Sequence, residues 1–467
     1  MQKVEFHIKY WSKIRKIIWL WSLVLCCISI AVYPKIFGWV INKPSPFSNT
    51  VNTVLSLSSI AILLTGLSMF FVYYLYLNKC SEKTKEIITL IVISVIICIF
   101  MVIFLEVLVR ILSPQNTLSQ ITSLSPFIYE QGKYISWKLK PNTSGRIITG
   151  EFNALYEINS FGHRDKERNK KKKNNLTRIL VLGDSFTVGF SVQQNETYSA
   201  VLEQLLTSQN KSVEVWNAGV IAYSPDTEYL VLKNTINEIK PDIVIVSFYS
   251  GNDVVDIGMN EWIVGDNNDN IVLPVKIISE VYTVENNQLI LKKPDDDKYR
   301  QSMTQQYINI LLLRFSHLYI LLKKSIYGVG TLDLEPIQMM HVQQSEEIQE
   351  NWQKTKNLLK EMYIISEQNN ASFSIVLIPS RMQVYDKEWN YVERRFGKNK
   401  LNRQLPQETL NEWCNKQKIQ CIDLLPKLTS AYKETDEQLY YNLQDMHFTA
   451  YGNKITAEII ADEILTG

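Results

Sequence analysis

The chain has 467 residues, a formal net charge of +2 and 46% hydrophobic residues, and its length indicates more than one structural unit. The near balance of charge argues against a nucleic-acid-binding protein, which would carry a strong basic excess. No Gly-rich phosphate-binding fingerprint occurs and no Cys or His cluster has metal-ligand spacing, so we expect neither an organic cofactor nor a metal.

The first 112 residues are apolar and basic. They hold 11 Lys and Arg against 4 acidic residues, whereas the rest of the chain carries a net charge of −5. Three apolar stretches, 17–41, 51–77 and 87–112, are each long enough to cross a hydrocarbon core of ~30 Å, which takes about 20 helical residues. The sequence therefore predicts a membrane anchor of three transmembrane helices over residues 1–112, with the lipid bilayer as a partner.

Basic residues predict the orientation of this anchor, because they favour the cytoplasmic side of a membrane. Eight of the 11 lie before the first stretch or between the second and the third. We expect an integral multi-pass protein whose N-terminus is cytoplasmic and whose chain after residue 112 is extracytoplasmic. Glu106 and Arg110, four residues apart, either form an ion pair or both face lipid headgroups.

Residues 113–175 predict short strands and turns, a β-rich linker or N-terminal extension. The segment ends in a basic run at Arg168 and 170–173. The default interpretation of such a run is a solvated loop, and the alternative is contact with an anionic polymer or headgroup.

From residue 176 to 467, strand and helix patterns alternate, which predicts right-handed crossovers and a parallel sheet. The predicted fold is α/β, a three-layer α/β/α sandwich with a parallel, flavodoxin-like sheet. Its strands are predicted at 179–182, 213–216, 243–248, 373–378 and 419–422, and its helices at 197–208, 226–239, 347–368, 408–416 and 450–465.

One stretch of this region, 254–345, is too long for an ordinary connection and is predicted to be an insertion. Its most regular piece, 307–325, predicts a helix. That helix either packs on the core, forms a lid, or rests on the bilayer.

Four short segments carry residues suited to acyl transfer. Ser185 lies in a Gly-Asp-Ser turn, Gly219 ends Val-Trp-Asn-Ala-Gly, and Asn252 lies in Ser-Gly-Asn-Asp. All three follow predicted strand ends, where ligands bind in parallel sheets. A serine nucleophile also needs a base, and only His447 of the five histidines has both a carboxylate at short spacing, Asp445, and a predicted helix directly after it. Each segment alone is also typical of a turn or a helix cap.

In this order the four segments resemble those of the SGNH hydrolases, the GDSL-like esterase and lipase superfamily. The resemblance covers about residues 176–466. It implies Ser185 as nucleophile, His447 as base and Asp445 as the acid that orients the base. It also implies an oxyanion hole made by the backbone of Ser185, by Gly219 and by the amide of Asn252.

The expected activity is that of a membrane-anchored serine esterase that removes or transfers an acyl group, with O-acetyl the favoured group, outside the cytoplasm. The expected partner is an acyl-ester substrate on envelope carbohydrate or lipid. Two alternatives stay open: an O-acyltransferase acting on an envelope polysaccharide, and a non-catalytic carbohydrate-binding or assembly module on the same fold.

Six cysteines are present, and only Cys414 and Cys421 fall in the predicted outer part. A disulfide is compatible with an oxidising compartment. Because one cysteine falls in a predicted helix and the other in a predicted strand, we expect two free thiols.

Overall fold

The computed structural model describes residues 81–113, 128–148, 152–209, 211–265, 272–279, 282–285, 288–291, 312, 316–327, 336–441 and 445–466. The chain divides into two compact units, one of residues 1–115 with 311–319 and one of residues 116–310 with 320–467. The predicted spans 17–41 and 51–77 lie outside the described residues.

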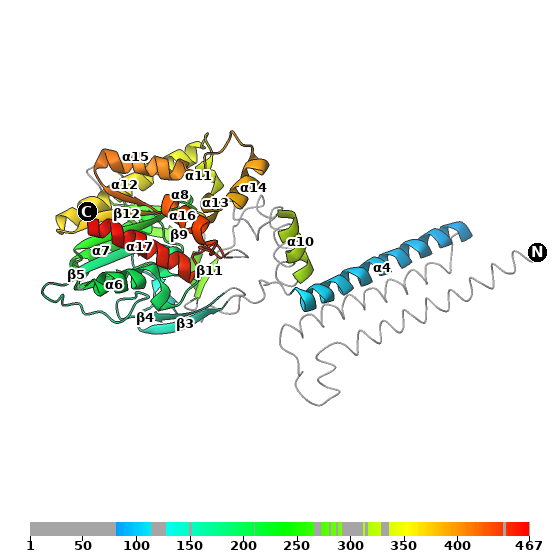
Figure 1. The fold of residues 1–467 in the computed structure, drawn as a ribbon, viewed down its shortest axis with the longest axis horizontal. Coiled ribbons are helices and arrows are strands. Elements are labelled where there is room, and N and C mark those ends of the chain that lie inside the picture. The colour runs from blue at the N-terminus through cyan, green and yellow to red at the C-terminus, as the bar shows by residue number, and fades with distance from the viewer. Residues whose placement is uncertain are drawn as a thin grey trace, which may run out of the picture. The chain divides into compact units, whose positions relative to one another are not determined.

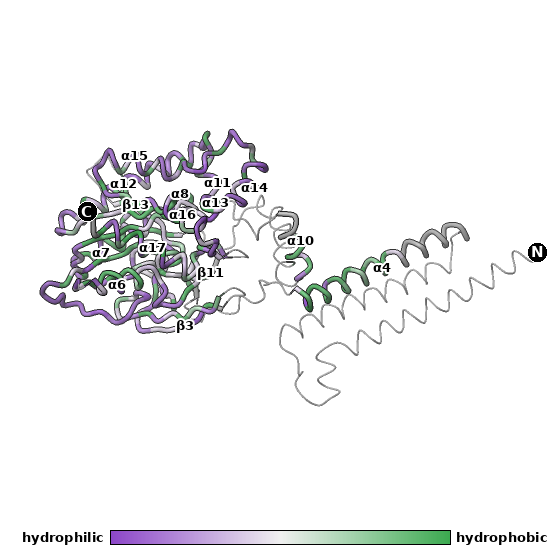
Figure 2. The backbone as a smooth tube through the Cα atoms, viewed as in Figure 1, coloured by the Kyte–Doolittle hydropathy of each residue, from purple (hydrophilic) through white to green (hydrophobic). Residues whose placement is uncertain are grey.

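The first unit contains the helix α4, Glu82–Leu112, which covers the third predicted span (Figure 1). Its described side chains are mostly hydrophobic (Figure 2). Those that are exposed are Val95, Ile97, Phe100, Met101, Val102, Phe104, Leu105, Val107, Leu108, Ile111 and Leu112. Near its end, Arg110 Nε lies 2.7 Å from Glu106 Oε1, so of the two alternatives for this pair the structure shows the i,i+4 ion pair.

The described part of the chain holds no helix that qualifies as a membrane span.

A parallel sheet forms the middle layer of the second unit. Among the described residues it has five strands in the order β13-β12-β7-β5-β6. The strands are β5 (Thr177–Gly183), β6 (Val213–Asn217), β7 (Ile243–Tyr249), β12 (Ser372–Ile378) and β13 (Gln420–Asp423). Read from β6, this is the flavodoxin-like order 2-1-3-4-5. The prediction of an α/β fold with a parallel sheet is confirmed.

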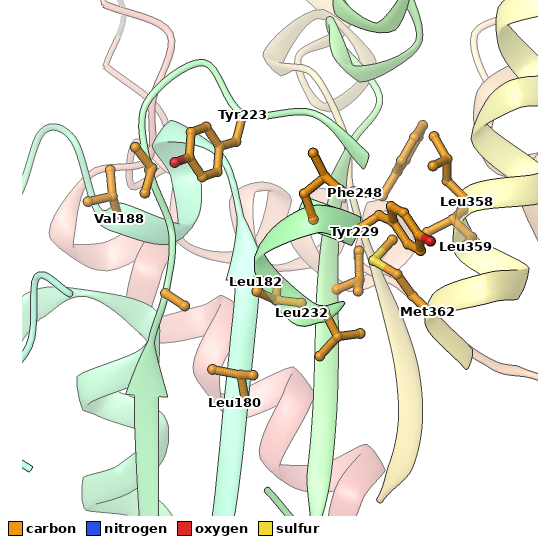
Figure 3. Close-up of a cluster of buried hydrophobic side chains, with 14 of the residues drawn as sticks. Leu180, Leu182, Val188, Tyr223, Tyr229, Leu232, Phe248, Leu358, Leu359 and Met362 are labelled. Atoms are coloured by element: carbon orange, nitrogen blue, oxygen red, sulfur yellow. The ribbon is translucent and has the colours of Figure 1, made fainter. Parts of the chain in front are cut away.

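Helices cover both faces of the sheet because alternate strand residues point to opposite faces. Leu180 and Leu182 of β5 belong to one apolar cluster, which Figure 3 shows, whereas Ile179 and Val181 belong to another. The first cluster includes α7 (Pro225–Ile239), α12 (Glu346–Gln368) and α15 (Leu405–Gln417), and the second includes α6 (Tyr198–Ser208), α16 (Leu425–Thr435) and α17 (Ala450–Thr466).

The segment before the sheet forms two antiparallel strand pairs. They are β1 (Tyr129–Glu130) with β2 (Lys138–Leu139), and β3 (Thr143–Ile148) with β4 (Asn153–Ile158). Within the predicted insertion lie the hairpins β8 (Asn260–Val264) with β9 (Pro274–Ser279) and β10 (Tyr282–Glu285) with β11 (Gln288–Leu291). Ile277 N donates to Tyr134 O at 2.8 Å, so β9 is hydrogen-bonded to the segment between β1 and β2.

Further helices lie between these elements in the described part of the chain. They are α5 (Ser185–Val188), η2 (Gln194–Glu196), α8 (Asp253–Gly258), α10 (His317–Tyr327), α11 (Ile337–Met340), α13 (Arg381–Val384) and α14 (Asp386–Phe396). The helix predicted at 307–325 corresponds in part to α10, and most of its first half lies outside the described residues.

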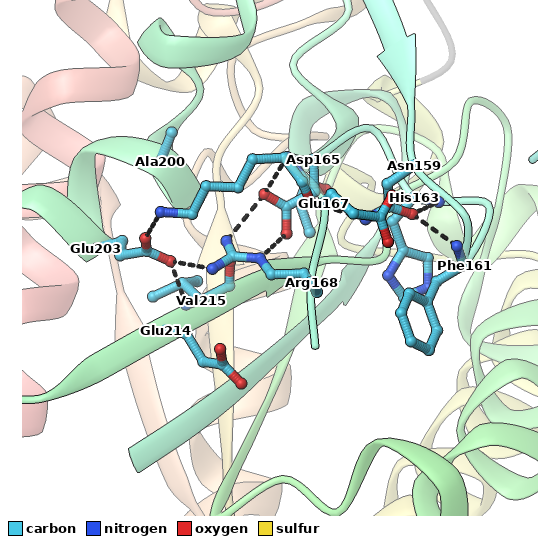
Figure 4. A network of polar contacts seen from close by, with 12 residues as sticks. Asn159, Phe161, His163, Asp165, Glu167, Arg168, Ala200, Glu203, Glu214 and Val215 are labelled. Carbon is cyan, nitrogen blue, oxygen red and sulfur yellow. Dashed lines mark hydrogen bonds and ion pairs between the residues drawn. The ribbon is translucent and has the colours of Figure 1, made fainter. Parts of the chain in front are cut away.

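The basic run at 168–173 is not simply a solvated loop. Arg168 is buried and forms ion pairs of 2.7 Å with both Asp165 and Glu203 (Figure 4). Lys170 pairs with Glu238 at 2.6 Å, and Lys172 pairs with Asp242. The solvated-loop prediction is wrong for Arg168, because Asp165 and Glu203 of α6 neutralise its buried charge, whereas the side chain of Lys170 is 66% exposed, as a solvated loop requires.

A second correction concerns the two cysteines of the outer part. Cys414 and Cys421 form a disulfide, with their Cα atoms 6.2 Å apart, and the prediction of two free thiols is wrong. The chain reverses between the end of α15 at Gln417 and the start of β13 at Gln420. Residues seven apart therefore face each other across a helix and the strand that follows it.

Candidate active site

Ser185 lies at the start of a four-residue helix that follows the carboxyl end of β5. Asp184 caps this helix, since its carboxylate Oδ1 accepts a hydrogen bond from Phe186 N at 2.8 Å. The helix ends at Gly189, whose φ of 71° lies in the left-handed region that favours glycine. Ser185 is therefore held at the edge of the sheet by the end of β5 at Gly183, by the N-cap Asp184 and by the C-cap Gly189.

Three predicted residues meet in one hydrogen-bond chain. Ser185 Oγ lies 2.7 Å from His447 Nε2, and His447 Nδ1 lies 2.9 Å from Asp445 Oδ1. The same carboxylate oxygen accepts a hydrogen bond from His447 N at 2.8 Å. Because Asp445 lies two residues before His447, its carboxylate can bind both the backbone N–H and the ring of the histidine. A serine, an imidazole and a carboxylate linked in this order can transfer a proton from the serine to the imidazole.

The imidazole of His447 lies against two phenyl rings. The ring centroids of Phe186 and Phe190 are 4.9 Å and 4.8 Å from it. Burial lowers the pKa of His447, but the carboxylates of Asp445 and Asp184 together more than offset burial, so the pKa lies above that of an ordinary histidine. This environment retains a base that can take up a proton near neutral pH.

The loop that carries Asp445 is held by a buried arginine that the sequence reasoning missed. Arg381 in α13 donates to the carbonyl oxygens of Tyr441, at 2.9 Å, and of Asp445, at 3.3 Å. Its charge is balanced by Glu388, 2.6 Å away and also buried. No short motif surrounds Arg381. Only its position directly after β12, the fourth strand of the central sheet along the chain, could have indicated a role.

Gly219 lies beyond β6, the strand on one side of β5. A Cβ atom there would approach Val188 N to 2.4 Å, so only glycine permits this contact with the serine helix. Its N–H, the predicted oxyanion donor, is already engaged with Asn217 Oδ1 at 3.1 Å. Asn217 in turn donates from Nδ2 to Thr187 O at 2.8 Å. In this state Gly219 and Asn217 hold the serine helix, and Gly219 must share its N–H to bind an oxyanion.

Asn252 lies beyond β7, the strand on the other side of β5, where it caps α8. Its Nδ2 donates to Asp256 Oδ2 at 2.8 Å. Because a side-chain amide has two N–H groups, Asn252 retains a second donor for a bound substrate. The loops after β6 and β7 thus bring both predicted donors to the edge of the sheet where Ser185 lies.

Buried carboxyl groups lie behind the serine helix. Burial raises the pKa of Asp184 to about 6 and raises the pKa values of Glu228 and Asp253 further above their ordinary range. Both carboxyl oxygens of Glu228 are buried without a hydrogen-bond partner in the described part of the chain. Among the described residues, no group of acidic, His or Cys side chains has the geometry of a metal site.

No protein-family model matches the chain, and no curated protein matches it. Solved structures do resemble it. A protein described as lipolytic and of the G-D-S-L family, from Desulfitobacterium hafniense DCB-2, is 16% identical over 61% of this chain and 98% of its own, with a TM-score of 0.30. The acetyl xylan esterase AlAXEase is 10% identical over 62% and 99%, with a TM-score of 0.32.

The psychrotrophic esterase EstA from Pseudoalteromonas sp. is 10% identical over 62% of this chain and 97% of its own, with a TM-score of 0.29. Likenesses at this level do not identify the activity of the chain.

Proposed function

We propose that this protein is a serine ester hydrolase. The observation that carries the proposal is the hydrogen-bond chain from Ser185 Oγ through His447 to Asp445, with distances of 2.7 Å and 2.9 Å. A serine hydroxyl reacts poorly at neutral pH unless a base takes its proton and a third group orients that base. This chain of contacts supplies both at the edge of a parallel sheet, where ligands bind.

The reaction proceeds in two steps. Ser185 Oγ attacks the acyl carbon while its proton passes to His447 Nε2, and the tetrahedral intermediate expels the alcohol, which takes that proton. Water then attacks the acyl-serine and gives a proton to His447 Nε2. The second tetrahedral intermediate releases the carboxylic acid, and the departing Ser185 Oγ takes that proton back from His447. Asp445 stays ionised throughout and holds the Nδ1–H tautomer of the ring.

The oxyanion of each intermediate requires donors that are already in place. We assign this role to the N–H of Ser185, the N–H of Gly219 and the second N–H of Asn252. In the absence of substrate the N–H of Gly219 donates to Asn217, and one of the two N–H groups of Asn252 donates to Asp256. The favoured substrate is an O-acetyl ester on carbohydrate or a lipid ester.

The test of the proposal is incubation of the full-length protein with a fluorophosphonate probe and, separately, with p-nitrophenyl acetate. We expect covalent labelling of Ser185 and release of both p-nitrophenol and acetate. Release of p-nitrophenol that depends on an added sugar or alcohol acceptor would instead identify an acyltransferase. A folded protein that neither reacts with the probe nor releases p-nitrophenol would refute the proposal.

Asp445→Asn should lower kcat by about 1,000-fold or more, because an amide does not hold the reactive tautomer of the ring. It should also move the acid limb of kcat/KM to lower pH. His447 acts only when neutral, the Asp445 carboxylate raises its pKa, and removing that carboxylate lowers the pKa again. The measurement is a pH–rate profile of both proteins. An unchanged acid limb with near-normal turnover would mean that another carboxylate orients His447.

We also propose, from the sequence alone, that residues 1–112 attach the protein to a membrane and that the catalytic unit faces away from the cytoplasm. A C-terminal alkaline phosphatase fusion should then be active, and a fusion after Lys79 should be inactive, because the odd number of crossings separates the two positions. The matched reporter is a green fluorescent protein fusion at each position, which should give the opposite pattern. Activity of the Lys79 fusion alone would place the catalytic unit in the cytoplasm.

A further inference from the structure

The segment Gly189–Val192, which we call the 189–192 turn, links the serine helix to the histidine. It follows α5 directly, and the ring of Phe190 packs on the imidazole of His447 with centroids 4.8 Å apart. Ser191 Oγ donates to Phe448 O at 2.8 Å. The 189–192 turn therefore contacts the His447 segment through both a ring and a hydrogen bond.

The backbone carbonyl groups of α5 and the 189–192 turn have few hydrogen-bond partners in regular secondary structure. A four-residue helix leaves its terminal C=O groups without helical partners, and a buried C=O without a partner is costly. In this protein, Arg164 supplies the partners. Its Nη1 donates to Val188 O at 2.9 Å and to Gly189 O, and its Nη2 donates to Val192 O at 2.7 Å.

Arg164 is itself fixed by the extension that precedes the sheet. It is 1% exposed, and its Nη2 also donates to Leu155 O of β4 at 2.7 Å. Its guanidinium lies 3.8 Å from the ring centroid of Tyr156 and makes a cation–π interaction with that ring. The hydroxyl of Tyr156 donates to Phe190 O at 3.0 Å. Two side chains of the extension thus bind four carbonyl groups between residues 188 and 192.

We propose that Arg164 and Tyr156 are positioning residues of the active site. They fix the 189–192 turn, and the turn fixes the imidazole of His447 against Ser185. The rigid planar fork of a guanidinium suits this task, since one group donates in several fixed directions at once. The proposal rests on the proposed hydrolase function. It also makes the extension part of the catalytic unit, where the sequence predicted a linker.

The first test is Arg164→Lys in the full-length protein, with p-nitrophenyl acetate as substrate. An ammonium cannot reach all the carbonyl oxygens that Arg164 binds, three between residues 188 and 192 and that of Leu155, so the turn should shift while the charge remains. A displacement of about 1 Å at reacting groups can cost about 100-fold in rate. We therefore expect kcat to fall about 100-fold with KM changed less than twofold, measured on the folded fraction at a temperature well below the melting point.

The matched control is Arg178→Lys. Arg178 is equally buried, lies over the ring of Trp216 at 4.7 Å, and donates to the backbone oxygens of Asn169, at 2.9 Å, and of Ile239. It is the second residue of β5, at the end of the strand opposite to Ser185. Both variants should lose thermal stability, but Arg178→Lys should retain kcat. Equal losses of kcat in the two variants would overturn the proposal, because they would indicate a general effect of a damaged core.

If Arg164→Lys does not fold, a pair of less disruptive variants, Tyr156→Phe and Tyr223→Phe, tests the proposal. Tyr156→Phe removes only the hydroxyl bond to Phe190 O, and Tyr223→Phe removes a comparable buried bond, from Tyr223 Oη to Trp137 O at 2.8 Å. We expect kcat to fall about fivefold in Tyr156→Phe alone, the effect of one lost hydrogen bond. Normal kcat in Tyr156→Phe would refute the proposal. Absence of labelling and turnover in the unaltered protein would instead refute the hydrolase function.

Discussion

Replacing Ser185 with alanine should abolish both fluorophosphonate labelling and ester hydrolysis. Loss of a serine nucleophile lowers kcat by about 10⁶-fold in enzymes of this mechanism, because the covalent step has no other acceptor. Stability should change little, since among the described residues the hydrogen bonds of Ser185 Oγ are those with His447 and, at 3.5 Å, with Asp184. The measurement is turnover of p-nitrophenyl acetate together with peptide mapping of the labelled residue.

Ser199→Ala is the matched control for that experiment. Ser199 is buried, whereas Ser185 is partly exposed, and the Ser199 hydroxyl has no hydrogen-bond partner in the described part of the chain. Labelling and turnover should therefore stay normal in Ser199→Ala. A label that mapped to a serine other than Ser185 would remove Ser185 as the nucleophile.

The strands of the central sheet were predictable from the sequence, because strands buried on both faces are continuous runs of apolar residues. β7 and β12 are each buried over six of their seven residues, and the predicted ranges differ from the observed ones by one residue. The short helices α5 and α13 were not predicted, since four residues contain too little periodicity to detect.

The candidate site was predictable in part. Ser185 and His447 are 262 residues apart, and only the order of the four segments indicated that the two would meet. Their catalytic roles, and those of Asp445, Gly219 and Asn252, remain predictions. The sequence could not show that Asn217 engages the N–H of Gly219, because that contact depends on how closely the loop approaches the serine helix.

Residues that support the site from a distance were missed for a different reason. Arginine is usually exposed, so a buried arginine such as Arg164 or Arg381 has no signature in a single sequence. Each is buried because several backbone oxygens converge on it, and that convergence is a property of the tertiary fold. The disulfide between Cys414 and Cys421 was missed in the same way, since it depends on the reversal between α15 and β13.

Replacing His447 with alanine should lower kcat about as much as loss of Ser185. The imidazole accepts the proton of the serine in the first step and that of water in the second, so neither step proceeds without it. Nucleophile and base act as one unit, and the Ser185→Ala, His447→Ala double variant should therefore be no slower than either single variant. The control is His341→Ala, because His341 pairs through an isolated bridge with Leu401 and has no contact with the hydrogen-bond chain. Multiplicative losses in the double variant would mean that Ser185 and His447 act independently, and the close contact between Nε2 and Oγ would then have no catalytic role.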